Sequence, residues 1–213
     1  MSQFFVIYPD NPQPRLIKQA AALIREGAVI VYPTDSGYAL GCHLGDKDAV
    51  ARIRQIRGVD EKHHMTLVCR DLSELAHYAK VDNTQFRLLK NNTPGSYTFI
   101  LVATKEVPRR LQHPKRSTVG LRIPDHPVAL ALLEELNEPL ISSTLILPDA
   151  CNPLTDIDEI RAYLESKVDL IIEGGAVGIE STTVIDLTES APILVRRGKG
   201  EVSHFGINDS DEN

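Results

Sequence analysis

The chain has 213 residues, 42% of them hydrophobic and 24% charged, which is typical of a folded protein with one sizeable core. Its formal net charge of −6 argues against a protein that binds nucleic acid over its whole surface. No stretch reaches the roughly 18 apolar residues that a membrane span needs. Because the first residues also lack the pattern of a signal peptide, we expect a cytoplasmic protein.

The elements are predicted from hydrophobic periodicity, taken in chain order. Helical spacing covers residues 16–24, 46–58, 71–79, 83–90, 127–136 and 157–164. Extended, apolar segments cover residues 29–32, 65–69, 97–102, 119–123, 140–147, 170–172, 183–187 and 193–195. This alternation predicts an α/β sheet covered by helices, and the crowding of strands late in the chain favours mixed pairing.

Cysteine usage and charge along the chain predict a single domain whose cysteines are reduced. Cys42, Cys69 and Cys151 are too few and too scattered for a disulfide framework or a zinc site, so we expect buried thiols and no protein-bound metal. We expect one domain over residues 1–206, followed at residues 207–213 by an acidic tail that does not fold.

The segment after the first predicted strand is the most informative part of the chain. Thr34, Asp35 and Ser36 follow the buried residues 29–32 directly. Consecutive hydroxyl and carboxylate groups are costly at the end of a buried strand unless they bond backbone or ligand. They therefore predict the floor of a pocket. The alternative is that Asp35 and Ser36 only form a side-chain-backed turn before Gly37.

Basic residues gather on the helix predicted at residues 46–58 and just after it. A solvated helix face explains Arg52 and Arg54, whereas Arg57 stands at the helix end, where a cation is favoured. His63 and His64 are adjacent, but no third ligand has a recognisable spacing, so the pattern does not favour a metal site.

Two later segments place polar groups at strand ends. Arg122 lies in an otherwise apolar strand, and a buried guanidinium needs a carboxylate, a phosphate or carbonyl groups. We predict that it faces the pocket; the alternative is a structural ion pair with Asp35 or Asp186. Residues 196–200 (RRGKG) suit oxyanion contacts by side chains and free backbone amides, although their spacing is not that of a P-loop.

In this order, the segments resemble the motifs of the YrdC/YciO family, the threonylcarbamoyl-AMP synthase superfamily, and most closely its YciO branch. Residues 33–41 (PTDSGYALG) are similar to the opening motif Pro-Thr-(Asp/Glu)-Thr-Val-Tyr-Gly-Leu, and residues 94–98 (PGSYT) to Pro-Gly-Pro-x-Thr. Residues 119–127 (VGLRIPDHP) resemble Val-x-x-Arg-x-Pro-x-His-Pro, and residues 182–186 (TTVID), with Arg196 and Gly198, resemble the closing motifs. The resemblance covers about residues 13–200.

The resemblance implies a YrdC/RibB-like fold, a twisted mixed α/β sheet flanked by helices, with a deep basic cavity. In catalytic members this cavity takes threonine, bicarbonate and ATP, with Mg²⁺ held through the phosphates rather than by protein ligands. The residues that the resemblance implies around the amino acid are Thr34, Tyr38, Arg122 and Thr182. Those that it implies around the nucleotide are Arg57, Thr118, Thr144 and Arg196. Of these, the residues implied in catalysis are Arg57, Arg122 and Thr144.

Two departures from the family pattern concern the reaction itself. Catalytic members carry Lys-x-Arg and Ser-x-Asn pairs, which align here with residues 57–59 (RGV) and 144–146 (TLI). Because Val59 and Ile146 are apolar, the sequence predicts a loss of transition-state stabilisation.

Two functions stay open at this point. One is a nucleotidyltransferase of the threonylcarbamoyl-AMP synthase type, linked to tRNA threonylcarbamoyladenosine modification. The other is a non-catalytic protein that binds double-stranded RNA or tRNA or associates with the ribosome. Residues 109–110 and 115–116, all basic, motivate the second, and their alternative is a solvated loop. A monomer and a homodimer both remain open.

Overall fold

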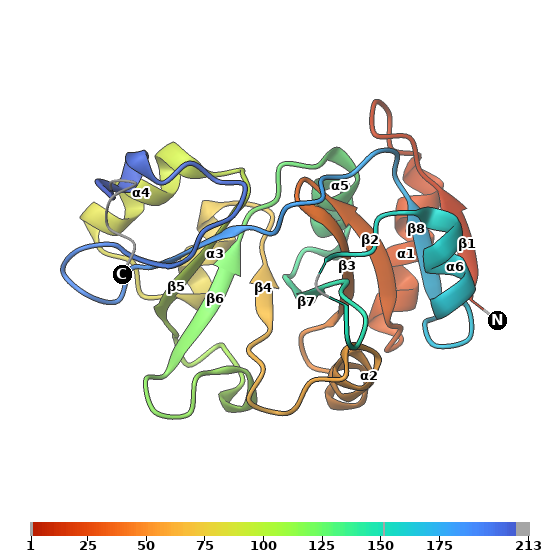
Figure 1. Cartoon of the computed structure of the whole chain (residues 1–213), viewed down its shortest axis with the longest axis horizontal. Helices are drawn as coiled ribbons and strands as arrows, with labels where there is room; N and C mark the ends of the chain where they lie inside the picture. Colours follow the sequence, from red (N-terminus) through yellow and green to blue (C-terminus); the bar gives the residue numbers. More distant parts are fainter. Residues whose placement is uncertain (1, 151, 208–213) are drawn as a thin grey trace.

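Helices and strands alternate along the chain in the computed structural model, which describes residues 2–150 and 152–207 (Figure 1). The helices are α1 (Pro14–Arg25), α2 (Lys47–Arg57), α3 (Leu72–Tyr78), α4 (Asn83–Asn92), α5 (Pro127–Leu136) and α6 (Ile157–Leu164), with 3-10 turns η1 (Arg109–Leu111) and η2 (Ser203–Phe205). The strands are β1 (Gln3–Val6), β2 (Ile30–Thr34), β3 (Gly37–His43), β4 (Thr66–Val68), β5 (Tyr97–Val102), β6 (Thr118–Arg122), β7 (Leu140–Thr144), β8 (Leu170–Glu173), β9 (Thr183–Asp186) and β10 (Ile193–Arg196).

All these strands belong to one sheet, in the order β1-β8-β2-β3-β7-β4-β6-β5-β9-β10. Parallel pairs such as β4 with β6 and β5 with β9 alternate with antiparallel pairs such as β2 with β3 and β5 with β6. The prediction of a mixed sheet flanked by helices is therefore confirmed.

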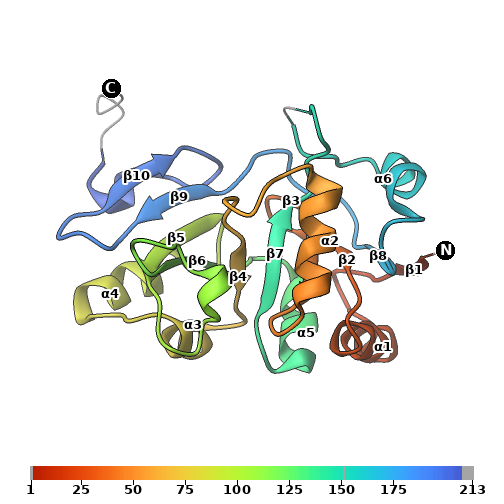
Figure 2. The same cartoon turned by 90° about the horizontal axis from the view of Figure 1, so that it is seen from below.

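Helices cover both faces of the sheet. Buried residues of α1 and α5 pack with Ile30, Tyr32 and Leu170, and these two helices lie side by side in Figure 2. Residues of α2 and α6 pack with Val31, Leu40 and other buried residues of the strands between β8 and β4. Where a helix covers a strand in this way, the polar side chains beneath it must find partners inside the protein.

Local sequence signals fix the ends of α2, which carries one wall of the site. The Asp46 carboxylate caps the helix by accepting from the Ala49 amide at 2.9 Å. At the other end Gly58 takes the left-handed conformation, with φ of 63°, and closes the helix directly after Arg57. The Arg57 side chain thus leaves from the last turn of α2.

Some boundaries differ from the predictions. The edge strand β1 is not among the predicted elements. The strand predicted at residues 140–147 ends at Thr144, where the Ile146 amide turns back to the Thr144 carbonyl oxygen at 3.0 Å. Residues 37–43, which the periodicity did not assign to an element, form β3.

Several further predictions concern the chain as a whole. Cys42 and Cys69 are buried free thiols, as predicted, and burial raises the pKa of Cys42 to about 12. Cys151 and residues 208–213 of the predicted tail lie outside the described residues. Among the helices of the described ranges, none is long and apolar enough to cross a membrane.

Candidate functional site

The turn between β2 and β3 holds the polar residues that follow the first buried strand. The Thr34 hydroxyl donates to the Gly37 carbonyl oxygen at 2.6 Å, and the Ser36 amide donates to Thr34 Oγ1 at 3.3 Å. Gly37 has φ of 137°, and the Gly178 carbonyl oxygen would be 3.3 Å from an added Cβ, so only glycine fits without strain. The turn before Gly37 is thus backed by the side chain of Thr34, whereas the alternative assigned this role to Asp35 and Ser36 alone.

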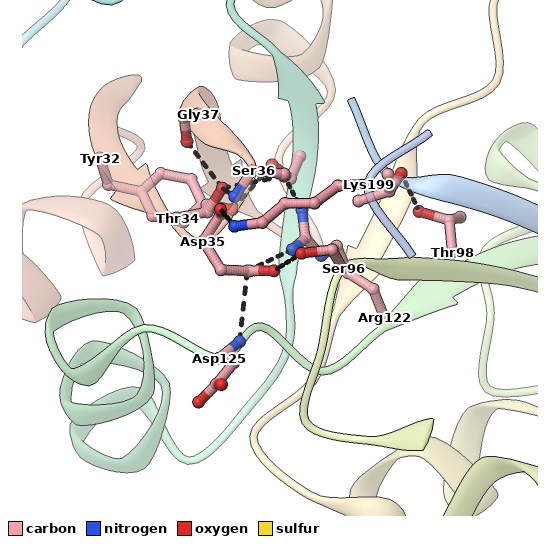
Figure 3. A network of polar contacts seen from close by, with 12 residues as sticks. Tyr32, Thr34, Asp35, Ser36, Gly37, Ser96, Thr98, Arg122, Asp125 and Lys199 are labelled. Atoms are coloured by element: carbon pink, nitrogen blue, oxygen red, sulfur yellow. Dashed lines mark hydrogen bonds and ion pairs between the residues drawn. The ribbon is translucent and has the colours of Figure 1, made fainter. Parts of the chain in front are cut away.

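Asp35 and Arg122 form a buried ion pair at this turn (Figure 3). Arg122 Nη2 lies 2.5 Å from Asp35 Oδ1, and the two side chains are 9% and 7% exposed. Arg122 Nη1 donates to Ser36 Oγ at 3.0 Å, and the Ser96 hydroxyl donates to the second carboxylate oxygen of Asp35. The alternative of an internal ion pair is thus correct for Asp35 and wrong for Asp186.

Asp186 binds a different arginine. Arg116 Nη2 lies 2.8 Å from Asp186 Oδ2, and the Thr188 hydroxyl donates to Asp186 Oδ1 at 2.6 Å. Burial opposes ionisation of Asp186, but the hydrogen bonds from Thr188 and Arg116 outweigh it and hold the pKa of Asp186 below its usual value. Arg116 is therefore anchored to β9 and is not a free loop side chain.

A cavity of about 300 Å³ opens on one face of the sheet beside the pair of Asp35 and Arg122. Because side chains alternate along a strand, residues two positions apart share this face, among them Thr66 and Val68 of β4, Thr98 and Ile100 of β5, and Thr118 and Gly120 of β6. An added Cβ at Gly120 would lie 3.3 Å from Thr98 Cγ2 and 3.6 Å from Thr66 Oγ1, so glycine keeps the floor low there.

All the residues that the resemblance implies for the site line this one cavity. They are Thr34, Tyr38, Arg57, Thr118, Arg122, Thr144, Thr182 and Arg196. Thr34 and Arg122 face the same hollow, so the ion pair with Asp35 does not remove the guanidinium from it. The Arg122 Nε is buried and has no hydrogen-bond partner among the described residues. The individual roles of these residues stay predictions.

Arg57 crosses from α2 to the end of β7. Its Nη1 donates to Ser143 Oγ at 2.5 Å and to the Thr144 carbonyl oxygen at 2.6 Å. Burial lowers the pKa of Arg57, because removal from water disfavours the charged form. The guanidinium therefore sits in the cavity wall with its position fixed by β7.

Arg196 forms the opposite wall. Its Nη2 donates to the Thr182 carbonyl oxygen at 2.9 Å and to Thr182 Oγ1 at 3.2 Å, and the Thr182 and Thr98 hydroxyls are 2.9 Å apart. The amides beyond it are occupied: Gly198 donates to Thr183 Oγ1 at 3.1 Å, and Lys199 donates to the Ser181 carbonyl oxygen at 2.9 Å. The prediction of free backbone amides in this segment is wrong, because these amides bind the chain around the start of β9.

Histidines stand at the mouth of the cavity. His63, His64 and His113 line it, and the rings of His64 and His113 have centroids 5.1 Å apart. Within residues 2–150 and 152–207, no group of three His, Cys, Asp or Glu residues could hold a metal ion.

Two further hollows adjoin the cavity. One, of about 500 Å³, lies across the turn at Thr34 and is lined by Asp35, Asp125, His126 and Lys199. The Lys199 ammonium donates to the Asp35 carbonyl oxygen at 2.6 Å and so holds the carboxyl-terminal segment on the turn (Figure 3). The other, of about 560 Å³, is a groove that shares the histidines with the cavity; its basic side chains are Arg54, Lys62, Arg109, Arg110 and Lys115.

Sequence reasoning missed several residues of the cavity wall. Ser142 and Ser143 lie inside β7, where two adjacent hydroxyls in a buried strand are the same signal that singled out Thr34. His63 was weighed only as a metal ligand. Its position beside Ser143 follows from the tertiary structure, because a loop and a strand far apart in the chain bring the two together.

The comparisons with known proteins agree with the fold. The family model of Sua5, YciO and YrdC proteins, described as "Telomere recombination", matches residues 22–198. The chain is 59% identical to YciO of Escherichia coli (strain K12) over 205 residues, which are 96% of this chain and 100% of that protein. The crystal structure of E. coli YciO superposes with a TM-score of 0.93 over 96% of this chain and 100% of the other.

More distant relatives carry a functional name. The chain is 32% identical over 189 residues to the threonylcarbamoyl-AMP synthase of Halorhodospira halophila, covering 88% of this chain and 98% of that protein. Sua5 of Pyrococcus abyssi, crystallised with L-threonine, superposes with a TM-score of 0.85 at 29% identity, over 92% of this chain and 58% of the other.

Proposed function

Since the chain belongs to the Sua5/YciO/YrdC family, we propose that it binds ATP and threonine, or a related amino acid, in the cavity and forms an acyl adenylate of the threonylcarbamoyl-AMP type. The observation that carries this proposal is that the family-like residues, scattered from Thr34 to Arg196, line a single cavity. The product would serve threonylcarbamoyl modification of tRNA adenosine.

The amino acid would lie at the end of the cavity formed by the turn between β2 and β3. Arg122 would bind its carboxylate from the cavity side of the guanidinium, while Nη1 and Nη2 keep their hydrogen bonds to Ser36 and Asp35. The hydroxyls of Thr34, Tyr38 and Thr182 would then orient the rest of the molecule. A guanidinium already fixed by Asp35 loses little freedom when the carboxylate arrives.

The nucleotide would lie toward Arg57 and Arg196, with Thr118 and Thr144 between them. The amino nitrogen and bicarbonate form a carbamate with loss of water, a carbamate oxygen attacks the α-phosphorus, and the bond from that phosphorus to the α,β-bridging oxygen breaks as pyrophosphate leaves. Such a transfer depends on positioning and charge neutralisation. Mg²⁺ would be held by the phosphates of ATP, and no protein ligand for it is needed.

Two apolar residues stand where catalytic members have polar ones. Ile146 lines the cavity, and Val59 follows Gly58, with its amide bound to the Arg54 carbonyl oxygen at 3.0 Å. Each missing donor to the transferring phosphate removes about 3 kcal/mol of transition-state stabilisation, so turnover would be slow.

The test is pyrophosphate release with ATP, Mg²⁺, bicarbonate and a panel of amino acids. We expect slow pyrophosphate release that depends on threonine or a related amino acid. The variant Arg122→Met should lose this release, and the control variant Arg87→Met, at an exposed arginine on α4, should keep it. Release no higher than the blank with every amino acid would refute the enzymatic proposal.

A second function is favoured by one observation, the basic groove that opens beside the cavity mouth. A groove lined by Arg54, Lys62, Arg109, Arg110 and Lys115 would bind the phosphates of duplex RNA or tRNA, with an affinity that falls steeply with salt. We expect the double variant Arg109→Ala, Arg110→Ala to weaken retention of duplex RNA, and the variant Arg87→Ala, Lys90→Ala on α4 to leave it unchanged. Equal retention of RNA by all three proteins, at low and high salt, would refute it.

A further inference from the structure

His63 stands in the cavity wall next to the arginine that the proposed function assigns to the nucleotide. Its Nε2 lies 3.5 Å from Ser143 Oγ, and Arg57 Nη1 donates to that same oxygen at 2.5 Å. An arginine has no acceptor, so the shared hydroxyl accepts from Arg57, and its own proton can point toward an unprotonated His63 Nε2. Its second lone pair can accept instead from a protonated Nε2, so the site accommodates the imidazole in either state.

The surroundings of His63 also disfavour its charged form. Burial lowers the pKa of His63, and the nearby charges of Arg57, His64 and Arg54 lower it further, against a weaker opposite effect of Asp60. The groups around the ring are thus Arg54 and Arg57 from α2, Asp60 and His64 from its own loop, and the uncharged Ser143 from β7. In the free protein these surroundings favour the neutral imidazole.

This position compensates for a charge that the chain lacks. The residue two positions after Arg57 is Val59, where catalytic relatives of the family pattern carry arginine, and an apolar side chain cannot neutralise phosphate. His63 is four residues further on, and its ring lines the same cavity as Arg57.

We infer that His63 couples anion binding to proton uptake. It takes up one proton when a phosphate-type anion binds beside Arg57, and so supplies a second cation only while the anion is present. This inference rests on the proposed function, because it deepens the nucleotide end of that site. The proton comes from solvent and goes to Nε2, and the Ser143 hydroxyl turns its proton away. The imidazolium then donates to the anion or to Ser143 Oγ.

The sign of the effect follows from linkage. An anion favours the charged imidazole, so the pKa of His63 rises on binding. Between the free and bound pKa values the complex takes up a proton, and anion affinity increases as the pH falls through that interval. A rise of about one pKa unit corresponds to about tenfold tighter binding well below the free pKa than well above the bound pKa.

The experiment uses the full chain and inorganic sulfate, because sulfate itself does not titrate between pH 6 and pH 8. Imidazole resonances are followed by NMR through this range with and without sulfate, and His63→Gln identifies the His63 signal. We expect sulfate to raise the pKa of His63 and to bind more tightly at pH 6 than at pH 8. In His63→Gln most of this pH dependence disappears, whereas His77→Gln, on the exposed side of α3, keeps it.

Outcomes of this test separate it from the proposed function. An unmoved His63 titration, or equal sulfate affinity at both pH values, overturns the inference even if threonine-dependent pyrophosphate release is found. A raised pKa without any pyrophosphate release supports the anion-linked proton and refutes only the synthase reaction. If sulfate binding is lost in His64→Gln but kept in His63→Gln, the proton belongs to His64 and the inference is overturned as well.

Discussion

Replacing Arg122 with methionine tests the centre of the site. The substitution leaves the Asp35 carboxylate, 7% exposed, without its cation, and among the described residues only the Ser96 hydroxyl and the Asp125 amide still donate to it. Two unit charges about 4 Å apart attract each other by about 4 kcal/mol at an effective dielectric constant of about 20. Removing one partner of a buried pair costs about 3–5 kcal/mol, because the other charge stays buried. We expect Arg122→Met to lose stability in this range.

The assay is urea unfolding of the wild type, Arg122→Met, Asp35→Asn and the double variant. The double variant removes both charges, so we expect it to regain at least about 1 kcal/mol relative to the sum of the single losses. Its response to threonine, measured as a thermal shift, should stay lost, because the guanidinium is still missing. A loss below about 1 kcal/mol in Arg122→Met, or additive single losses, would contradict the reasoning that the pair is desolvated.

Three further outcomes are expected. Thr34→Val leaves the Gly37 carbonyl oxygen without its hydroxyl donor and should cost about 1–3 kcal/mol in urea unfolding, while it raises the KM for the amino acid. Gly198→Ala places a Cβ 2.2 Å from the Ser181 carbonyl oxygen and should cost about 3 kcal/mol, because backbone cannot yield cheaply. Asp186→Asn should make the free energy of unfolding fall less steeply as the pH is lowered into the acid range. The depressed pKa of Asp186 in the folded state gives stability that is present above the unfolded-state pKa of about 3.9 and is lost as the pH falls through the folded-state pKa.

Each of these outcomes has a control. Thr104→Val, at an exposed hydroxyl, should leave the KM unchanged, and a KM unchanged in Thr34→Val as well would remove Thr34 from the amino-acid site. In Gly45→Ala the added methyl meets only the His43 ring, so a loss as large as that of Gly198→Ala would show that the clash is not the cause. An acid limb of Asp186→Asn as steep as that of the wild type would show that the pKa of Asp186 is not depressed.

The helices and the central strands could be predicted from the sequence, because their signals are local. The spacing of Ile17, Ala20 and Ile24 on one face of α1 and the cap at Asp46 require only neighbouring residues. The short edge strand β1 and the end of β7 at Thr144 could not, because pairing partners elsewhere in the chain decide where an extended segment stops being a strand.

The candidate site divides in the same way. That Thr34 and Arg122 need polar partners follows from their place in buried, apolar strands, and the order of motifs pointed to the family. Which acid Arg122 binds did not follow, since Asp35 and Asp186 are both internal carboxylates and only the tertiary structure brings the turn of Asp35 against the end of β6. The partners of Gly198 and Lys199 were equally hidden, because backbone amides carry no sequence signal.

By itself, then, the sequence determined that buried polar groups exist at certain strand ends and that the chain folds as a helix-covered mixed sheet. The tertiary structure alone decided which of those groups meet: it joined Arg57, Ser143 and His63 on one wall and set Arg122 against Asp35 beside an open cavity. The physical reason is that desolvation of a polar group is a local property of its strand, whereas the partner that offsets this cost is chosen by the register and order of strands far apart in the chain.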